Sequence, residues 1–128
     1  MAINHRQIEM FRADEVDLPK VLAELHKKYG GQPDLLRIAK INEQIVAGYA
    51  LVSPTERQGY FDLKWISVLP EFRRQGVGRW MAGHAMGVAE SKSGRGLRTR
   101  HGEPEQFFQE LGFAHTPADW FTMEFLPE

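Results

Sequence analysis

Hydrophobic and polar positions first follow the two-residue period of a strand and then the spacing of a helix. Residues 7–12 alternate polar and apolar side chains, which predicts a half-buried strand. The apolar positions that follow share one helical face: Leu18, Val21, Leu22, Leu25 and Tyr29. We expect a helix that is capped by Asp17, carries Pro19 in its first turn and stops at Gly30.

The remaining pattern predicts short strands around two further helices. A tight polar turn at Asn42 and Glu43 separates two of the strands. After the first helix we expect strands at 35–41, 45–52 and 60–69, a helix at 77–90, a strand at 96–101, a helix from 104 to 112, and strands at 113–116 and 120–125. The resulting order, βαβββαβαββ, indicates an α/β (α+β) fold.

The strand predicted at 60–69 changes phase along its length. Phe61, Leu63 and Trp65 occupy odd positions, whereas the next apolar residues, Ile66 and Val68, occupy even ones. A β-bulge, which inserts one extra residue into a strand, produces such a change. A strand buried on both faces is the alternative, because phase then carries little information.

A strand, a glycine-containing turn and a helix N-terminus follow one another between Ile66 and Trp80. A helix N-terminus presents unpaired N–H groups and the positive end of the helix dipole, so it favours an anion such as phosphate. Gly76 and Gly78 remove Cβ atoms where a ligand would approach the main chain. Three arginines add positive charge at the same point: Arg73, Arg74 and Arg79.

This stretch closely resembles the acyl-CoA-binding motif of the GNAT superfamily of N-acetyltransferases. The motif, Arg/Gln-x-x-Gly-x-Gly/Ala, is present here as Arg73-Arg74-Gln75-Gly76-Val77-Gly78. The resemblance implies a mixed, mostly antiparallel sheet with flanking helices and a splayed, V-shaped strand pair. It also implies that the amides from Gln75 to Arg79 hold the pyrophosphate of acetyl-CoA. The pantetheine arm would lie along the preceding strand, at Ile66, Ser67 and Val68. A plain strand-turn-helix connection without a ligand explains the arginine cluster poorly.

Composition narrows the remaining classes of function. The 128 residues fit one domain, 1–128, and the net charge of −1 gives no sign of a nucleic-acid binder. Without cysteine there is no disulfide, thiolate metal site or cysteine nucleophile, and the five histidines are too scattered to predict a metal site. We find no apolar run of membrane-spanning length and no leader pattern, so we expect a cytoplasmic protein with no membrane partner.

The groups that would move protons are less clear than the cofactor loop. The family often places a tyrosine acid in the helix before the last strands, and here that position holds Phe108. His101 closes the preceding strand and could exchange a proton near neutral pH. Asp62 and Glu71 flank the central strand as candidate bases. For each of these groups the alternative is an ordinary surface or packing role.

Two functions therefore follow from the resemblance. The first is an acetyl-CoA-dependent N-acetyltransferase that acts on an unidentified amine of a small molecule or a protein. The second is a non-catalytic, acetyl-CoA-responsive regulator, similar to the PanZ/PanM branch that promotes maturation of aspartate decarboxylase. That branch also has one N-terminal helix and lacks the tyrosine. The sequence leaves open whether the protein is a monomer or a homodimer.

Overall fold

The computed structural model describes residues 4–100, 105–116 and 120–125, and its centre is a seven-stranded sheet. The strand order is β1-β2-β3-β4-β5-β7-β6, with antiparallel pairing except between β4 and β5, which are parallel. The strands are β1 (Glu9–Arg12), β2 (Leu36–Ile41), β3 (Gln44–Val52), β4 (Tyr60–Val68), β5 (Gly96–Thr99), β6 (Ala114–His115) and β7 (Phe121–Glu124). The predicted mixed sheet is confirmed.

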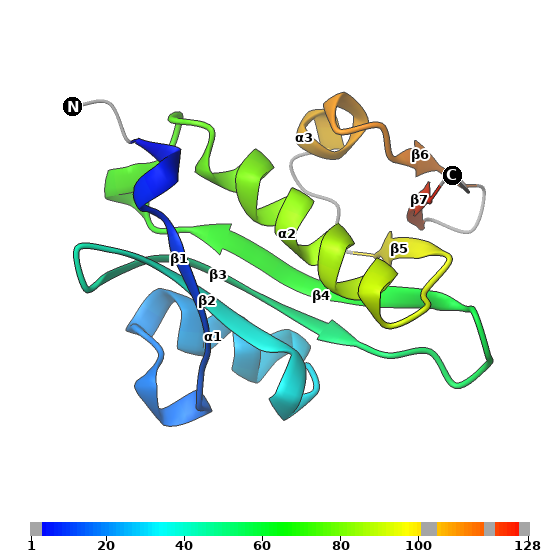
Figure 1. Ribbon diagram of the computed structural model, residues 1–128, viewed down its shortest axis with the longest axis horizontal. Helices are drawn as coiled ribbons and strands as arrows, with labels where there is room; N and C mark the ends of the chain where they lie inside the picture. The colour runs from blue at the N-terminus through cyan, green and yellow to red at the C-terminus, as the bar shows by residue number, and fades with distance from the viewer. Residues whose placement is uncertain (1–3, 101–104, 117–119, 126–128) are drawn as a thin grey trace.

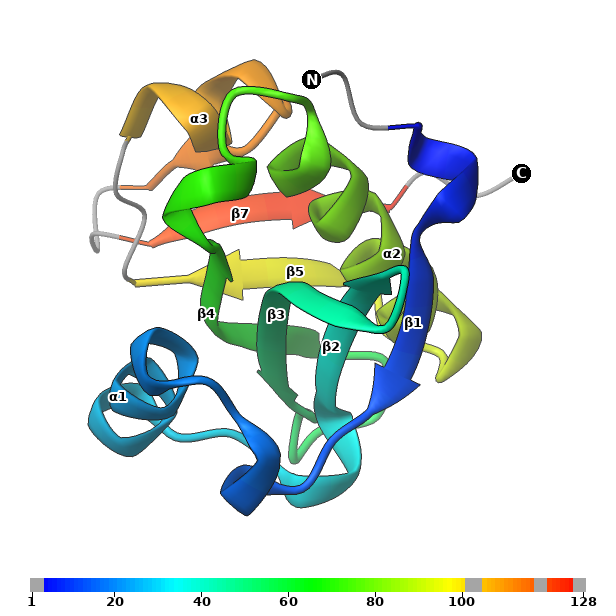
Figure 2. The same cartoon turned by 90° about the vertical axis from the view of Figure 1, so that its left-hand side faces the viewer.

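Helices cover both faces of this sheet (Figures 1 and 2). The helices are α1 (Lys20–Tyr29), α2 (Val77–Ser91) and α3 (Glu105–Glu110), and the 3-10 turns are η1 (His5–Gln7), η2 (Glu15–Asp17), η3 (Pro33–Leu35) and η4 (Pro70–Phe72). The α1 helix lies on one face, and α2 and α3 lie on the other. Apart from the short 3-10 turns, the element order is the predicted βαβββαβαββ.

The start of α1 differs from the prediction. Asp17 ends the short η2 turn, and Pro19 occupies the N-cap position of α1 without a side-chain cap. The proline ring disfavours the helical conformation for the residue before it, and Leu18 is accordingly extended, with φ −75° and ψ 135°. The helix therefore cannot begin before Pro19, and Asp17 is too early to cap it. Its end at Gly30, with φ +79°, is as predicted.

The hairpin between β2 and β3 has the predicted tight turn. Asn42 and Glu43 both adopt positive φ, 50° and 66°. Two consecutive left-handed residues are characteristic of a type I′ turn, whose twist matches that of the strands it joins. The hairpin places β3 at the centre of the sheet, between β2 and β4.

The predicted phase change in β4 is a bulge at Lys64. Trp65 faces Ala50 on β3 and Leu63 faces Leu51, so Lys64 has no partner. Phe61 and Leu63 pack in the cluster beneath α2, whereas Trp65 packs on the opposite face with α1. The bulge is thus confirmed, one residue before the position that the sequence pattern indicated.

The strands β4 and β5 separate soon after they meet. Their parallel pairing runs from Tyr60 opposite Gly96 to Asp62 opposite Arg98. From there to Val68, β4 remains paired with β3, while β5 pairs with β7. From residue 63 to residue 68, one edge of β4 thus has no neighbouring strand in the described sheet. This is the splayed pair that the resemblance implies.

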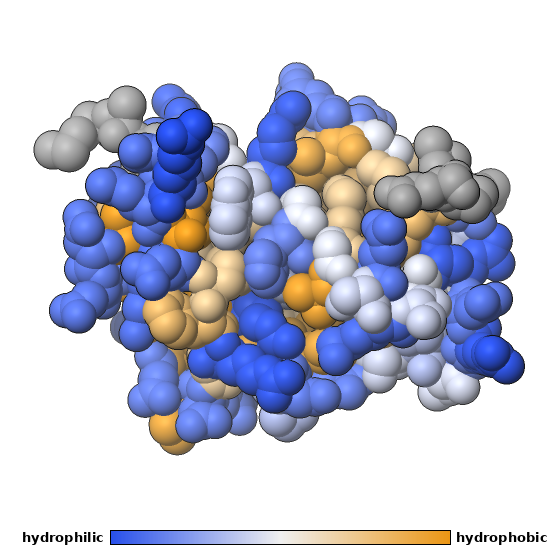
Figure 3. Space-filling view, viewed as in Figure 1, coloured by the Kyte–Doolittle hydropathy of each residue, from blue (hydrophilic) through white to orange (hydrophobic). Residues whose placement is uncertain are grey.

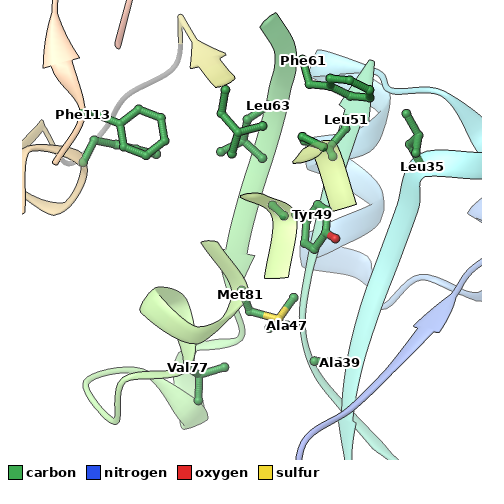
Figure 4. Packing of buried hydrophobic residues seen from close by; sticks show 14 of the residues in the cluster. Leu35, Ala39, Ala47, Tyr49, Leu51, Phe61, Leu63, Val77, Met81 and Phe113 are labelled. Atoms are coloured by element: carbon green, nitrogen blue, oxygen red, sulfur yellow. The ribbon is translucent and has the colours of Figure 1, made fainter. Parts of the chain in front are cut away.

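The core lies mainly between the sheet and α2. Figure 4 shows residues of this cluster, among them Ala47 and Tyr49 of β3, Leu63 of β4, and Val77 and Met81 of α2, each at most 2% exposed. A smaller cluster on the other face joins α1 to Trp65. Burial of this kind is the main stabilising contribution to a domain of this size. It fixes α2, and hence the loop in front of it, against β4.

Candidate functional site

A cavity of about 670 Å³ opens between the end of β4, the loop before α2, and α3. Its lining comes from three places in the chain: Ile66, Ser67 and Val68 of β4; Phe72, Arg73, Arg74, Gly76, Gly78 and Arg79 of the loop and first helical turn; and Phe107, Phe108 and Glu110 of α3. We call it the large cavity. Figure 3 shows hydrophobic surface over α3, bordered by hydrophilic side chains. The structure therefore assembles most of the predicted cofactor residues around one space.

Two predicted cofactor residues do not line this cavity. Val77 is 1% exposed and packs into the core beneath α2. Gln75 turns its side-chain oxygen, Oε1, into the protein, where it is buried and has no hydrogen-bond partner in the described structure. Any role of these two residues toward a ligand would therefore be exerted through the main chain.

The loop before α2 turns sharply. Arg74 and Gly76 both have left-handed backbone angles, with φ of 64° and 79°. The Arg73 Nε atom donates a hydrogen bond to the carbonyl oxygen of Val68, at 2.8 Å. This bond ties the loop back to the end of β4, so the arginines are held beside the strand edge that lacks a partner.

The N-terminus of α2 is open toward the large cavity. The Trp80 N–H donates to the carbonyl of Gly76 at 3.1 Å, which closes the first turn. The N–H groups of the three preceding residues have no acceptor within the helix, and no side chain caps it. Gly78 and Arg79 line the cavity at this point. The helix end and its arginine therefore form a positively polarised wall.

His5 contacts the loop before α2, and sequence reasoning missed this contact. Its Nε2 atom donates to the carbonyl of Gln75 at 2.8 Å, across a separation of 70 residues. A Cβ atom on Gly76 would lie 2.9 Å from His5 Cε1. The η1 turn thus packs directly against the loop before α2, and no local pattern signals such a long-range contact.

A second cavity, of about 320 Å³, lies on the α1 side of the place where β4 and β5 part. Its lining residues are Leu25 and Tyr29 of α1, Leu63, Trp65 and Ile66 of β4, Thr99 and Arg100 at the end of β5, and Phe108 of α3. We call it the small cavity. Ile66 and Phe108 line both cavities. The two spaces therefore approach each other where β4 and β5 part.

Phe108 lies at this meeting point, where the family often has tyrosine. It is 2% exposed and makes edge-to-face contacts with Phe107 and Phe113, at centroid distances of 5.1 and 5.4 Å. Its ring has no proton to donate. The apolar packing around it explains why phenylalanine is stable at this position.

Two of the predicted proton-transfer residues, Asp62 and Glu71, line neither cavity. Asp62 accepts a hydrogen bond from Arg98 Nε at 2.5 Å and lines neither cavity. Glu71 is exposed on η4. His101 lies outside the described residues. In the described ranges, no group of three or more His, Cys, Asp and Glu side chains could hold a metal ion.

A tyrosine-histidine pair joins β3 to α2, apart from both cavities, with Tyr49 buried and His84 partly buried. The Tyr49 hydroxyl and His84 Nδ1 are 2.7 Å apart, and His84 stacks on Trp80. Burial raises the pKa of Tyr49 well above its ordinary value, so this hydroxyl stays protonated and donates to the imidazole. Burial, and secondarily the charge of Arg37, lower the pKa of His84. The pair therefore favours a neutral histidine.

Comparison with known sequences agrees with the geometry of the loop and the splayed strands. The family model described as an acetyltransferase (GNAT) domain matches residues 33–115, which is more than half of the chain. The protein therefore belongs to the GNAT acetyltransferase family. No curated protein sequence matches the chain.

Solved structures share this fold at low sequence identity. A GNAT family acetyltransferase from Elizabethkingia anophelis with acetyl-CoA bound has a TM-score of 0.69 and 20% identity, covering 93% of this chain and 99% of its own. Ard1 from Thermoplasma volcanium gives 0.68 and 14%, covering 94% and 99%. N-acetylglutamate synthase from Neisseria gonorrhoeae, complexed with coenzyme A and L-arginine, gives 0.79 and 14%; the match covers 94% of this chain but only 34% of the synthase. In the described residues, no helix is long and apolar enough to span a membrane.

Proposed function

We propose that this protein binds acetyl-CoA in the large cavity and transfers its acetyl group to an amine that enters through the small cavity. The observation that carries this proposal is the pair of cavities that share Ile66 and Phe108 where β4 and β5 part. A cofactor on one face of the sheet and an acceptor on the other could meet there without either passing through the core.

The residues of the large cavity fit acetyl-CoA. The free N–H groups at the start of α2, with Arg74 and Arg79 beside them, suit a pyrophosphate. The edge of β4 that lacks a neighbouring strand suits an extended, amide-bearing arm, which can pair with it as an added strand would. The rings of Phe107 and Phe108 supply apolar surface at the inner end.

When bound, acetyl-CoA supplies a thioester carbonyl that an uncharged amine can attack. Phe108 shields the meeting point from water but has no proton to donate. Other groups must therefore accept and donate the protons that the transfer requires. The hydroxyl side chains that line the two cavities are Ser67, Tyr29 and Thr99. His101 directly follows Arg100 in the chain, so it remains our candidate for proton exchange, and Asp62 is the weaker candidate because Arg98 already binds it.

Calorimetry with acetyl-CoA tests the binding half of the proposal. Replacing Arg74 and Arg79 together with glutamine should weaken binding at least tenfold at low salt, and less at high salt, because two charges near the phosphates are lost. The matched control is a double replacement of Arg12 and Arg57, which are exposed and line neither cavity. Equal effects of the two double variants would contradict the assigned phosphate site.

Release of free thiol in the presence of a broad amine panel tests the catalytic half. Release above background for even one amine supports the transferase. Phe108→Tyr places a phenol at the meeting point and should raise kcat on that amine, since a general acid contributes roughly 10²–10⁴-fold. If acetyl-CoA binds but no amine of the panel causes thiol release above background, catalysis is refuted.

The absence of a phenol at Phe108 also favours a second function, an acetyl-CoA-responsive regulator. In that case the arginine-rich loop and the bound cofactor would form a surface for a protein partner, with aspartate decarboxylase as the partner that the resemblance implies. Acetyl-CoA-dependent co-elution with that enzyme, together with silence in the thiol assay, would establish this function over the transferase. The result for Phe108→Tyr separates the two again, because a regulator gains no turnover from the phenol.

A further inference from the structure

Among the described residues, the lining of the small cavity combines apolar side chains with one charged residue. Leu25, Leu63, Trp65, Ile66 and Phe108 give it hydrophobic walls. Its volume of about 320 Å³ is at the low end of ligand sites, which typically measure roughly 300–1,000 Å³. The space therefore suits a small molecule rather than a folded segment of a protein.

Trp65 contributes its ring to this cavity rather than a hydrogen-bond donor. Its indole N–H donates to Nδ1 of His26 at 3.2 Å, on the α1 side. His26 is 7% exposed, and its ring lies edge-on to the indole. Because this donor is already satisfied, a ligand meets only the apolar surface of Trp65. The polar recognition of a ligand must come from elsewhere in the lining.

Arg100 is the charged residue in the lining of the small cavity. It is exposed, and its guanidinium carbon lies 4.4 Å from the ring centroid of Trp120. Stacking on an aromatic ring engages the flat face of a guanidinium and leaves its N–H groups directed outward in the plane. No carboxylate in the described part of the chain forms an ion pair with Arg100.

Arg98 provides an internal comparison. It also lies over the ring of Trp120, at 4.5 Å, but its Nε is bound to the carboxylate of Asp62 at 2.5 Å. The charge of Arg98 is therefore balanced by Asp62, whereas no carboxylate of the described residues balances that of Arg100. Among the described residues, no aspartate or glutamate lines the small cavity. A cationic acceptor such as a polyamine would be repelled by the positive charge of Arg100, while a carboxylate would be attracted to it.

We propose that Arg100 binds a carboxylate of the acceptor, so that the acceptor is a small amino acid with an apolar side chain and a free carboxylate. The guanidinium would grip the carboxylate through two parallel N–H···O bonds. The side chain would lie against Leu25 and Trp65, and the amine would point toward Ile66 and Phe108. This inference rests on the proposed transferase function and adds the chemical class of the acceptor.

The test compares each amino acid with the same molecule lacking the negative charge: leucine with leucinamide, and phenylalanine with phenylalaninamide. The amides have the less basic amines and so offer more of the uncharged nucleophile at a fixed pH. Intrinsic reactivity therefore works against the expected preference. For the wild-type protein we expect kcat/KM for each acid to exceed that of its amide at least tenfold.

Arg100→Gln should lower kcat/KM for the acids about 10- to 100-fold, as expected for the loss of a charge-assisted pair, and change the amides less than about threefold. Arg100→Lys should recover part of the loss, because lysine restores the positive charge but not the two parallel N–H donors of the guanidinium. Arg12→Gln, on strand β1, removes the same charge outside both cavities and should match the wild type.

A binding measurement gives a readout independent of turnover. N-acetyl-leucine should bind the CoA-saturated wild-type protein more tightly than N-acetyl-leucinamide does, and Arg100→Gln should remove the difference. Acetylation of amides as readily as acids, or an unchanged preference in Arg100→Gln, would overturn this inference and leave the transferase standing. Silence with every amine while acetyl-CoA still binds would overturn both.

Discussion

Gly76 and Gly78 stand two residues apart, and the structure needs the missing Cβ of each for a different reason. Gly76 has φ +79°, a conformation that L side chains rarely adopt, and His5 is packed against it. Gly78 has no such strain, but a Cβ there would lie 3.2 Å from the ring of Phe107. The first glycine therefore shapes the loop, and the second allows α3 to approach α2.

We predict that Gly76→Ala lowers the free energy of unfolding by about 1–3 kcal/mol, through left-handed strain and the clash with His5. His5→Ala alone should cost about 0.5–1.5 kcal/mol, because one hydrogen bond to the loop is lost. In the double variant the clash is absent while the strain remains. Urea unfolding of all four proteins should therefore give a double variant more stable than the sum of the single effects predicts, and strict additivity would contradict the contact.

His84 links stability to pH. Its pKa is lowered in the folded protein, so below the ordinary value of 6.5 the unfolded chain binds more protons than the folded one. Stability should therefore be fully present above pH 6.5 and decrease as the pH falls toward the folded pKa. His84→Gln should flatten this part of the stability curve, by at most about 1.4 kcal/mol per pH unit for one proton. Identical slopes in the two proteins, measured by urea unfolding between pH 5 and 7.5, would show that His84 is not responsible.

Individual residues differed in how far the sequence could place them. The loop residues Arg73 to Arg79 are contiguous, so local pattern was enough to predict that most of them meet at one site. The contacts of His5 with Gln75 and of Asp62 with Arg98 join distant parts of the chain. No periodicity encodes such pairs, and the sequence therefore left Asp62 looking like a free carboxylate.

At the level of elements, β4 shows what a hydrophobic pattern can predict. The change of phase was visible because a buried strand keeps its apolar residues on fixed faces. The sequence pattern placed the bulge one residue too late, because Trp65 is apolar and is buried against α1 rather than α2. Similarly, Pro19 was compatible with the first turn of a helix, but the extended residue before it moved the start.

Deleting Lys64 should remove the bulge without misplacing a side chain. Leu63 would still face Leu51, and Trp65 would still face Ala50, in a now regular ladder. Because a bulge bends its strand, the deletion should straighten β4 and narrow its separation from β5. We expect a folded protein whose affinity for acetyl-CoA falls at least tenfold, measured by calorimetry.

The control for this deletion is the removal of Arg57 from the exposed loop before β4. It shortens the chain by the same amount and should leave the affinity within about threefold, because surface loops tolerate changes of length. If the protein without Lys64 folds and binds acetyl-CoA like the control, the bulge is not what opens the strands.

For the whole molecule, the sheet consists of two unequal parts. Strands β1 to β4 form one part with α1 and α2, and strands β5 to β7 form the other with α3. Between them, the β-ladder runs only from Tyr60–Gly96 to Asp62–Arg98. Packing of α2 against both β4 and β5 adds to this connection.

Because the ladder between β4 and β5 is short, the proposed ligand would have a structural role as well as a chemical one. With the arm of acetyl-CoA laid along β4, the two parts of the sheet would be bridged on the side where the protein itself leaves them apart. The amides of residues 63–68 that face the gap should exchange with deuterium faster in the free protein than those of β3, and slow down selectively when acetyl-CoA binds. Uniform slowing over the whole chain would instead indicate general stabilisation. The sheet would then be rigid across both parts only when acetyl-CoA is bound, and loss of acetyl-CoA would loosen one part relative to the other.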